Sequence, residues 1–196
     1  MDKQILISIS REYGSRGREI AIKVAEDMGL PLYDRNILEE IAKEKGTDPK
    51  NFQDIDEKPR NKLLTRRVKG YSNSMEENLA QMQFEYLQKK ADSGESFVVL
   101  GRCSETVLKG REGLVSIFVT GEREAKIQHI MDKFSISREE AIAKIYKHDI
   151  SRKRYHNHYY DFKWGDSRNY DVCINSSRLG PQGTAEVLEA YIQKGL

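Results

Sequence analysis

The residues with the clearest chemistry lie near the N-terminus, where a largely apolar run leads into a glycine loop and then into an amphipathic segment. This order of strand, glycine loop and helix is how α/β proteins bind phosphates, because loop N–H groups and the helix N-terminus face the anion. Gly14 and Gly17 allow the backbone to approach an anion closely. An ordinary strand-to-helix turn also uses glycine, but the neighbouring Arg11, Arg16 and Arg18 favour an anion site.

The spacing of the loop is close to the phosphate-binding pattern G-x-x-x-x-G-K-[ST] and departs from it at three positions. When the pattern is laid on Gly17, Glu12, Arg18 and Glu19 stand where Gly, Lys and Ser or Thr are expected. Arg18 offers the positive charge of the lysine as a planar fork rather than as a compact point charge. Glu19 either binds Mg²⁺, directly or through water, or only favours the first turn of the helix.

Two further candidates stand where predicted strands end. Asp34 follows the short strand predicted at 31–33, where its carboxylate suits a hydrogen bond to a ribose or base, or a helix cap. Arg102 follows the apolar run 97–100, a position where arginine rarely has a core role. A bidentate contact to a phosphate is therefore favoured there over a salt bridge to Glu105.

A third group of candidates shares one predicted helix. Asp149, Arg152 and His156 are three and four residues apart and therefore lie on one face, with Arg154 nearby. A solvated helix face is one interpretation, and a lid that closes on phosphates is the other. The histidines show no metal-binding spacing, and surface positions are predicted for His129, His148, His156 and His158.

Hydrophobic periodicity places the other elements around these residues. Strands are predicted at 4–10, 31–33, 97–100, 114–119 and 170–175. Amphipathic helices are predicted at 17–28, from Asp34 or Asn36 to Gly46, after Ser74, around 127–131, after Ser137 and after the last strand. Ser74 and Ser137 begin capping boxes, and Thr184 caps the last helix. Alternating strands and helices predict a parallel sheet covered on both faces. Ligands of such sheets bind beyond the carboxyl ends of the strands, where the candidate residues lie.

Composition narrows the class of protein. A chain of 196 residues predicts one α/β domain, in which the polar and irregular residues 47–73 form an inserted flap. The net charge of +2 argues against bulk nucleic-acid binding. Cys103 and Cys173 form neither a metal motif nor a disulfide framework, and no apolar run reaches the length of a membrane span. The first residues suggest no signal peptide, so a cytoplasmic protein is expected, and nothing in the sequence indicates its oligomeric state.

As a set, these segments resemble the cytidylate kinase-like family of P-loop nucleoside monophosphate kinases. The resemblance runs nearly end to end and rests on residues 9–20, 32–34, 98–103, 149–152, 164–166, 170–177 and 179–180. It implies a P-loop NTPase-like parallel sheet flanked by helices, in a single kinase-like domain over 1–196 with a flap and a lid. It also implies ATP-dependent phosphoryl transfer to CMP or dCMP, with Mg²⁺.

The resemblance implies roles for individual residues. The phosphates of ATP would be held by Gly14, Ser15, Arg16, Gly17, Arg18 and Glu19, of which Glu19 is also the candidate metal ligand. Asp34 and Arg102 would face the nucleoside monophosphate, and 47–73 would match the flap that binds it. Arg18 would act in catalysis together with Arg152 and Arg154, which would close from a lid at about 148–166.

The chain also departs from the family pattern. Leu100 and Cys103 stand where established members carry acidic residues beside the Gly-Arg pair, and the flap matches poorly. Three alternatives therefore remain: a kinase of another small metabolite, a nucleotide-binding regulator without catalysis, and a dinucleotide-binding oxidoreductase. The last is suggested by Asp34 at a strand end, although the loop lacks the full G-x-G-x-x-G pattern.

Overall fold

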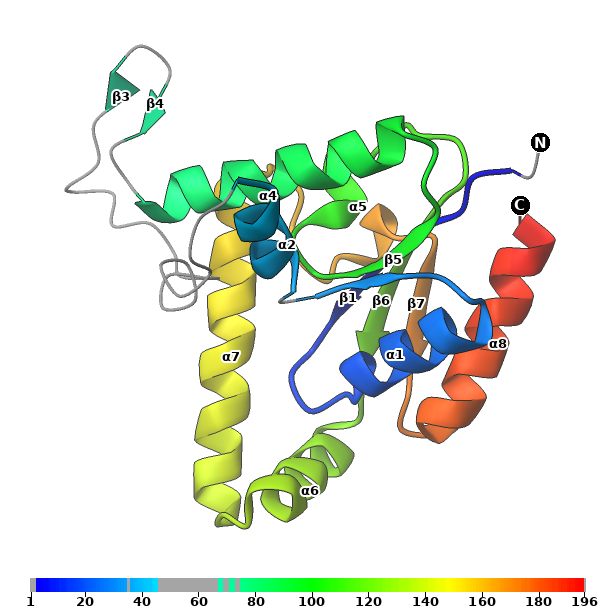
Figure 1. The fold of residues 1–196 in the computed structure, drawn as a ribbon. Helices are drawn as coiled ribbons and strands as arrows, with labels where there is room; N and C mark the ends of the chain where they lie inside the picture. The colour runs from blue at the N-terminus through cyan, green and yellow to red at the C-terminus, as the bar shows by residue number, and fades with distance from the viewer. Residues whose placement is uncertain (1–2, 35, 46–66, 69–70, 73–74, 196) are drawn as a thin grey trace.

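A five-stranded parallel sheet forms the centre of the computed structural model, with strand order β2-β5-β1-β6-β7 and helices on both faces (Figure 1). The strands are β1 (Leu6–Arg11), β2 (Leu32–Tyr33), β5 (Phe97–Leu100), β6 (Leu114–Thr120) and β7 (Val172–Asn175). A separate antiparallel pair consists of β3 (Arg67–Val68) and β4 (Tyr71–Ser72). The structure describes residues 3–34, 36–45, 67–68, 71–72 and 75–195. The predicted α/β fold is confirmed.

β1 lies in the middle of the sheet because its side chains are buried on both faces. Leu6 belongs to the apolar cluster on one face, whereas Ile7 and Ile9 belong to the cluster on the other. Successive side chains of a strand point to opposite faces, and a strand that is apolar on both is typical of the interior of a parallel sheet. Because β1 pairs in parallel with β5 and β6, the carboxyl ends of these three strands lie at the same end of the sheet.

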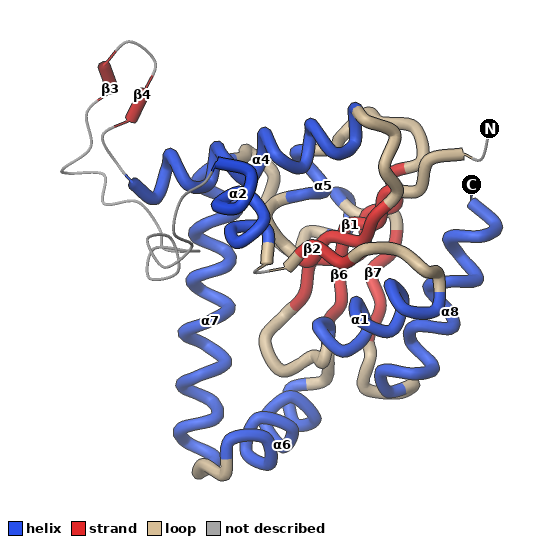
Figure 2. Tube along the Cα trace, in the orientation of Figure 1, coloured by secondary structure: helices blue, strands red, loops and turns tan. Residues whose placement is uncertain are grey.

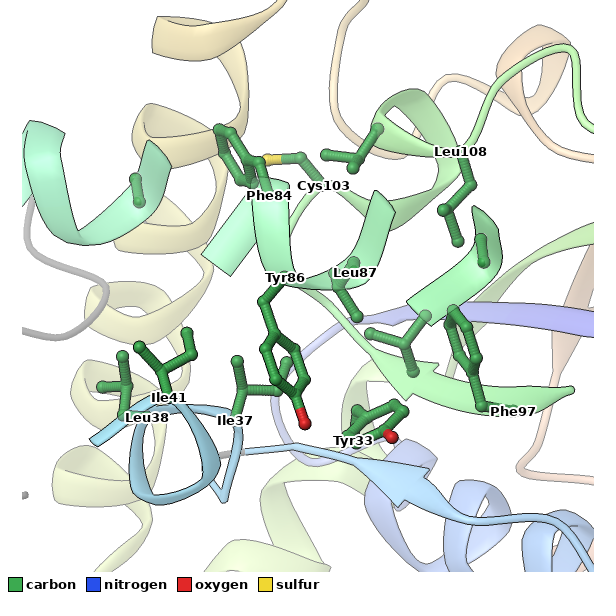
Figure 3. Packing of buried hydrophobic residues seen from close by; sticks show 14 of the residues in the cluster. Tyr33, Ile37, Leu38, Ile41, Phe84, Tyr86, Leu87, Phe97, Cys103 and Leu108 are labelled. Carbon is green, nitrogen blue, oxygen red and sulfur yellow. The ribbon is translucent and has the colours of Figure 1, made fainter. Parts of the chain in front are cut away.

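The helices divide between the two faces. One face carries α1 (Gly17–Asp27) and α8 (Gly180–Gly195), and the other carries α2 (Ile37–Lys45), α4 (Met75–Asp92) and α5 (Ser104–Val107). Figure 3 shows the apolar cluster on the face of α2, α4 and α5, in which Tyr33, Phe97 and Leu87 are buried together. This packing orients the short turn after β5, which bears Arg102.

α6 (Arg123–Phe134) and α7 (Arg138–Tyr159) form a helical hairpin that follows β6 and extends beyond the sheet (Figure 2). Ile127, Ile130 and Ala141 make a small apolar core between them. The capping box predicted at Ser137 is confirmed, since its side chain accepts a hydrogen bond from the Glu140 N–H and Glu140 bonds back. A short 3₁₀ helix, η1 (Ser167–Asn169), precedes β7. In the part of the chain that the structure describes, no helix is both long and apolar enough to cross a membrane.

One prediction about the elements needs correction, and one element was not predicted. Thr184 does not cap the last helix, because α8 begins at Gly180 and the Thr184 hydroxyl donates to the Gly180 carbonyl at 2.6 Å. The glycines and Pro181 in this stretch suggest a loop, but proline fits the first turn of a helix, where its missing N–H is not needed. The short helix α5 was not predicted. The capping box at Ser74 and most of the flap at 47–73 lie outside the described residues.

Candidate active site

The glycine loop, residues 12–17, connects β1 to α1 and is held by bonds from its own turn and from the residue that follows β7. The Ser15 hydroxyl donates to the Glu12 carbonyl at 2.8 Å, and the Ser15 carbonyl accepts from the Ser176 hydroxyl at 2.7 Å. Gly14 has φ +85°, and a Cβ there would lie 3.1 Å from both Cβ and the carbonyl oxygen of Lys126. Glycine is therefore required where α6 lies against the loop.

We define the inner flank of the loop as the side where α6 and α7 contact Glu12 and Tyr13. One carboxylate oxygen of Glu12 accepts from Lys126 Nζ at 2.7 Å, from the Thr120 hydroxyl at 2.7 Å and from the Gly121 N–H at 3.3 Å. Burial acts to raise the pKa of Glu12, but hydrogen bonds from Lys126 and Thr120 outweigh it and leave the pKa below its usual value. Glu12 is therefore a carboxylate with a stable negative charge.

Tyr13 joins the loop to α7. Its N–H donates to Asp149 Oδ1 at 2.7 Å, and its ring stacks on His148 with centroids 4.1 Å apart. The Arg152 guanidinium lies 5.5 Å from the same ring and donates to the Arg11 carbonyl at 3.0 Å. Burial raises the pKa of Asp149, although the Tyr13 N–H and the Arg152 charge oppose the shift. Three residues of α7 thus contact the loop and the adjoining end of β1.

We define the outer flank as the side formed by Arg16, Arg18, Glu19 and Asp34. Arg18 Nε donates to Asp34 Oδ2 at 2.9 Å, and the Arg18 side chain is 66% exposed. Arg16 Nη2 donates to Glu19 Oε2 at 2.6 Å. These four residues line a cleft of about 380 Å³ whose other walls include residues of α6 and Arg152. The cleft is open to solvent and is rich in both charges.

Arg102 lies in a different cavity, at the turn that follows β5. Gly101, Arg102 and Cys103 all have positive φ, at 80°, 61° and 52°. Left-handed backbone costs a residue other than glycine about 1–2 kcal/mol, so this turn stores strain where it directs Arg102. Arg102 is only 3% exposed and lines a cavity of about 30 Å³ together with Ser10, Arg152 and other residues.

A buried pair connects α7 with α5 beside that cavity. His156 Nε2 lies 2.7 Å from Glu105 Oε1, and both side chains are almost fully buried. Glu105 also accepts from the Ser10 hydroxyl at 3.3 Å. The surface position predicted for His156 is therefore wrong. The face of α7 that it shares with Arg152 packs toward the sheet, where Glu105 of α5 is its buried partner.

The structure brings most of the predicted site residues together in two neighbouring places. Arg16, Gly17, Arg18, Glu19 and Asp34 line the cleft. Gly14 lies beneath α6, and Ser15 is buried within the loop. Arg102 lines the cavity, and Arg152 lines both. Arg154 is exposed and is not among the residues that line either place.

Three further residues contact the loop, namely Lys126, Thr120 and Asp149. Lys126 and Thr120 were not among the predicted site residues. Thr120 ends β6, so the rule that ligands bind beyond strand ends pointed to its neighbourhood. Within the described residues, no group of three or more His, Cys, Asp or Glu side chains is placed to hold a metal ion. Glu19, the predicted metal ligand, bonds Arg16 in this structure.

Comparisons with known proteins identify the family and the fold. The model of the cytidylate kinase-like family matches residues 6–178. A cytidylate kinase of Pyrococcus horikoshii is 26% identical over 191 residues, which cover 96% of this chain and 88% of that protein. The solved structure of an uncharacterized protein from Eubacterium ventriosum matches with a TM-score of 0.77 at 31% identity, covering 97% of this chain and 99% of that one.

A more distant likeness concerns the fold alone. Shikimate kinase from Bacteroides thetaiotaomicron matches with a TM-score of 0.56 at 10% identity, over 96% of this chain and 98% of that one. The fold is thus that of P-loop kinases, and the chain belongs to the cytidylate kinase-like family. Family and fold together support a nucleotide kinase that uses a nucleotide such as ATP.

Proposed function

We propose that the protein transfers a phosphoryl group from ATP to a nucleoside monophosphate, with CMP or dCMP as the favoured acceptor. The observation that carries this proposal is the meeting of Arg102 and Arg152 at one small cavity beside the end of β1. Guanidinium groups suit phosphate oxygens because their planar set of donors makes paired, charge-assisted hydrogen bonds. The family, and the relative named cytidylate kinase, favour CMP or dCMP among the possible acceptors.

The residues of the glycine loop fit the phosphates of ATP. α1 begins at Gly17, so its first N–H groups and its dipole favour an anion at this place. The cleft beside it is lined by the cationic side chains of Arg16, Arg18 and Lys133. We propose that residues 14–19 hold the phosphates, with Glu19 as the candidate ligand of Mg²⁺. ATP supplies the phosphoryl group, and Mg²⁺ neutralises charge on its phosphates.

The other side chains have proposed roles in positioning. Arg152 lines both the cleft and the cavity, which suits a guanidinium that neutralises charge on the phosphoryl group during transfer. Arg102 would hold the phosphate of the acceptor, and Asp34 would bond its ribose or base. Residues 47–73 would close over the acceptor as a flap, and residues 148–166, with Arg154, would act as the lid.

A kinase assay with a panel of acceptors tests the proposal. Purified protein is given ATP, Mg²⁺ and, in turn, CMP, dCMP, UMP, AMP and shikimate, and ADP release is followed by a coupled reaction. Turnover is expected with CMP or dCMP. The proposal fails if no nucleoside monophosphate is phosphorylated while a control kinase works in the same mixture. Turnover of another metabolite would indicate the alternative acceptor class, and tight ATP binding without transfer would indicate a regulator.

The role of Arg102 has a separate test by calorimetry. Arg102→Ala is expected to weaken binding of CMP about tenfold or more, since a charge-assisted pair contributes roughly 1.5–3 kcal/mol. ATP binding is expected to change much less. Arg168→Ala, which removes an exposed arginine outside both binding places, is the matched control. Equal losses for CMP and ATP would contradict the assignment of Arg102 to the acceptor.

A further inference from the structure

We propose that Lys126 of α6 supplies the ammonium group that the glycine loop lacks at position 18, and that Glu12 holds this ammonium in place for a phosphate of ATP. The inference rests on the proposed function, because it names a residue that would contact the triphosphate. Neither the loop pattern nor the resemblance assigns a role to Lys126, which lies 114 positions from Glu12 in the chain.

Arg18 occupies the position of the missing lysine and lines the cleft, but its guanidinium is paired with a carboxylate there. Its guanidinium bonds Asp34 at 2.9 Å on the outer flank, and its side chain is 66% exposed. A guanidinium is a broad, planar fork, whereas the ammonium of a loop lysine acts as a compact point charge. The residue that aligns with the lysine is therefore unlike it in shape.

Lys126 has the properties that Arg18 lacks. Its side chain is only 12% exposed, and its Nζ lies 2.7 Å from the carboxylate of Glu12, the first residue of the loop. Its stem passes between two glycines: a Cβ on Gly14 would lie 3.1 Å from Lys126 Cβ, and a Cβ on Gly121 would lie 3.2 Å from Lys126 Cγ. Glycine at both positions makes room for the stem and places the ammonium against the loop.

Charge and hydrogen-bonding capacity also favour this role. The carboxylate of Glu12 would repel a phosphate at the loop unless a cation neutralised it. An ammonium has three N–H donors, so Lys126 can bond Glu12 and still donate to a phosphate oxygen. Thr120 and Gly121 donate to the same Glu12 oxygen and fix the carboxylate that holds the lysine.

Two roles for Lys126 must be separated, namely neutralising Glu12 alone and contacting the phosphate as well. Glu12→Gln removes the negative charge of Glu12 and keeps an oxygen acceptor at the same place. If Lys126 only neutralises Glu12, the double variant Glu12→Gln/Lys126→Met regains the ATP affinity of the native protein. If Lys126 contacts the phosphate, the double variant binds ATP as weakly as Lys126→Met.

Calorimetric titration of ATP into these variants, without an acceptor, tests the inference. Lys126→Met and the double variant are both expected to raise the Kd for ATP about tenfold or more, as for the loss of a charge-assisted bond. Lys147→Met, which removes an exposed lysine of α7, is the matched control. Lys126→Gln, with a polar side chain of similar length, replaces Lys126→Met if circular dichroism shows that the latter is unfolded.

The outcomes distinguish this inference from the proposed function. If native protein binds ATP and Lys126→Met binds it as well as Lys147→Met does, the inference is overturned and the kinase proposal stands. Recovery of affinity in the double variant also overturns it. If native protein binds no ATP at all, the proposed function fails, and the inference fails with it.

Discussion

The two flanks of the glycine loop contain the same kinds of charged side chain and hold them in opposite ways. On the inner flank, Glu12 bonds Lys126, which is 12% exposed, and Tyr13 bonds Asp149. On the outer flank, Asp34 is only 13% exposed, but its partner Arg18 has 66% of its side chain exposed. Exposed ion pairs contribute only about 0–1 kcal/mol, whereas shielded groups with several partners hold one geometry.

If the proposed function holds, this difference predicts that the two flanks have different roles in binding ATP. The inner flank is organised before a ligand arrives, since residues of β6, α6 and α7 already fix the carboxylates and the lysine. Preorganised charge stabilises a transition state without rearrangement during the reaction, and this is usually the largest single contribution to enzymatic catalysis. The outer flank can rearrange at small cost when an anion enters the cleft. We therefore expect the inner-flank pair of Glu12 and Lys126 to matter more for ATP binding than Arg18 on the outer flank.

Replacing Arg152 should have the largest effect, because it touches both the loop region and the cavity of Arg102. Arg152→Ala is expected to lower kcat on the order of 10³-fold, as for other arginines that stabilise a transferred phosphoryl group. Arg154→Ala, two residues away and exposed, is expected to lower kcat far less. Steady-state kinetics of both variants measures the difference. Similar losses in the two variants would mean that the contact of Arg152 with the inner flank has no special importance.

Gly14→Ala should destabilise the fold through the contact between α6 and the loop. Left-handed backbone costs alanine about 1–2 kcal/mol, and its Cβ would also crowd Lys126. Gly110→Ala is the matched control, because Gly110 has φ +82° and a Cβ added there would meet no atom within 4 Å. The free energy of unfolding in urea is expected to fall further for Gly14→Ala. An equal fall in both variants would show that α6 shifts away from the added methyl group without a further loss of stability.

The two carboxyl groups of the inner flank, Glu12 and Asp149, should also affect how stability depends on pH. Because the pKa of Glu12 lies below 4.5 in the folded protein, its stabilisation is fully present above pH 4.5 and is lost as the pH falls through the folded value. Asp149 has the opposite sign: its pKa is raised above 3.8, so its contribution favours the fold at low pH and is lost as the pH rises through the folded value.

Two variants separate these contributions. Compared with native protein, Glu12→Gln should lose less stability on acidification below pH 4.5. Asp149→Asn should lose less stability as the pH rises from 3.8 through the folded pKa of Asp149. Urea denaturation at a series of pH values gives both slopes. Parallel curves for native protein and both variants would show that these carboxyl groups titrate as they do in the unfolded chain.

The smallest effect is expected on the outer flank. Arg18→Ala breaks the bond to Asp34, yet the free energy of unfolding should fall by only about 1 kcal/mol, because the guanidinium is 66% exposed and screened by salt, although Asp34 itself is only 13% exposed. ATP affinity should fall less than it does in Lys126→Met. A loss of affinity in Arg18→Ala as large as in Lys126→Met would assign the phosphate contact to both flanks and remove the contrast between them.

Much of the fold was predictable because its signals are local. The apolar run of β1 and the glycines after it predicted a buried strand and a phosphate-type loop, and β1 is indeed buried on both faces. The Ser137 capping box depends on residues three positions apart, and the structure confirms it. The prediction at Thr184 failed because a proline and two glycines are compatible with both a loop and the first turn of a helix.

The amino-acid sequence determined the sheet, the glycine loop and the set of arginines, since periodicity and residue type act over a few positions. Only the tertiary structure decided which of these groups meet. Glu12 and Lys126 are 114 positions apart, and Tyr13 and Asp149 are 136 apart. Such pairs form because the α6–α7 hairpin folds back over the end of the sheet. For the same reason His156, for which a surface position was predicted, lies buried against Glu105.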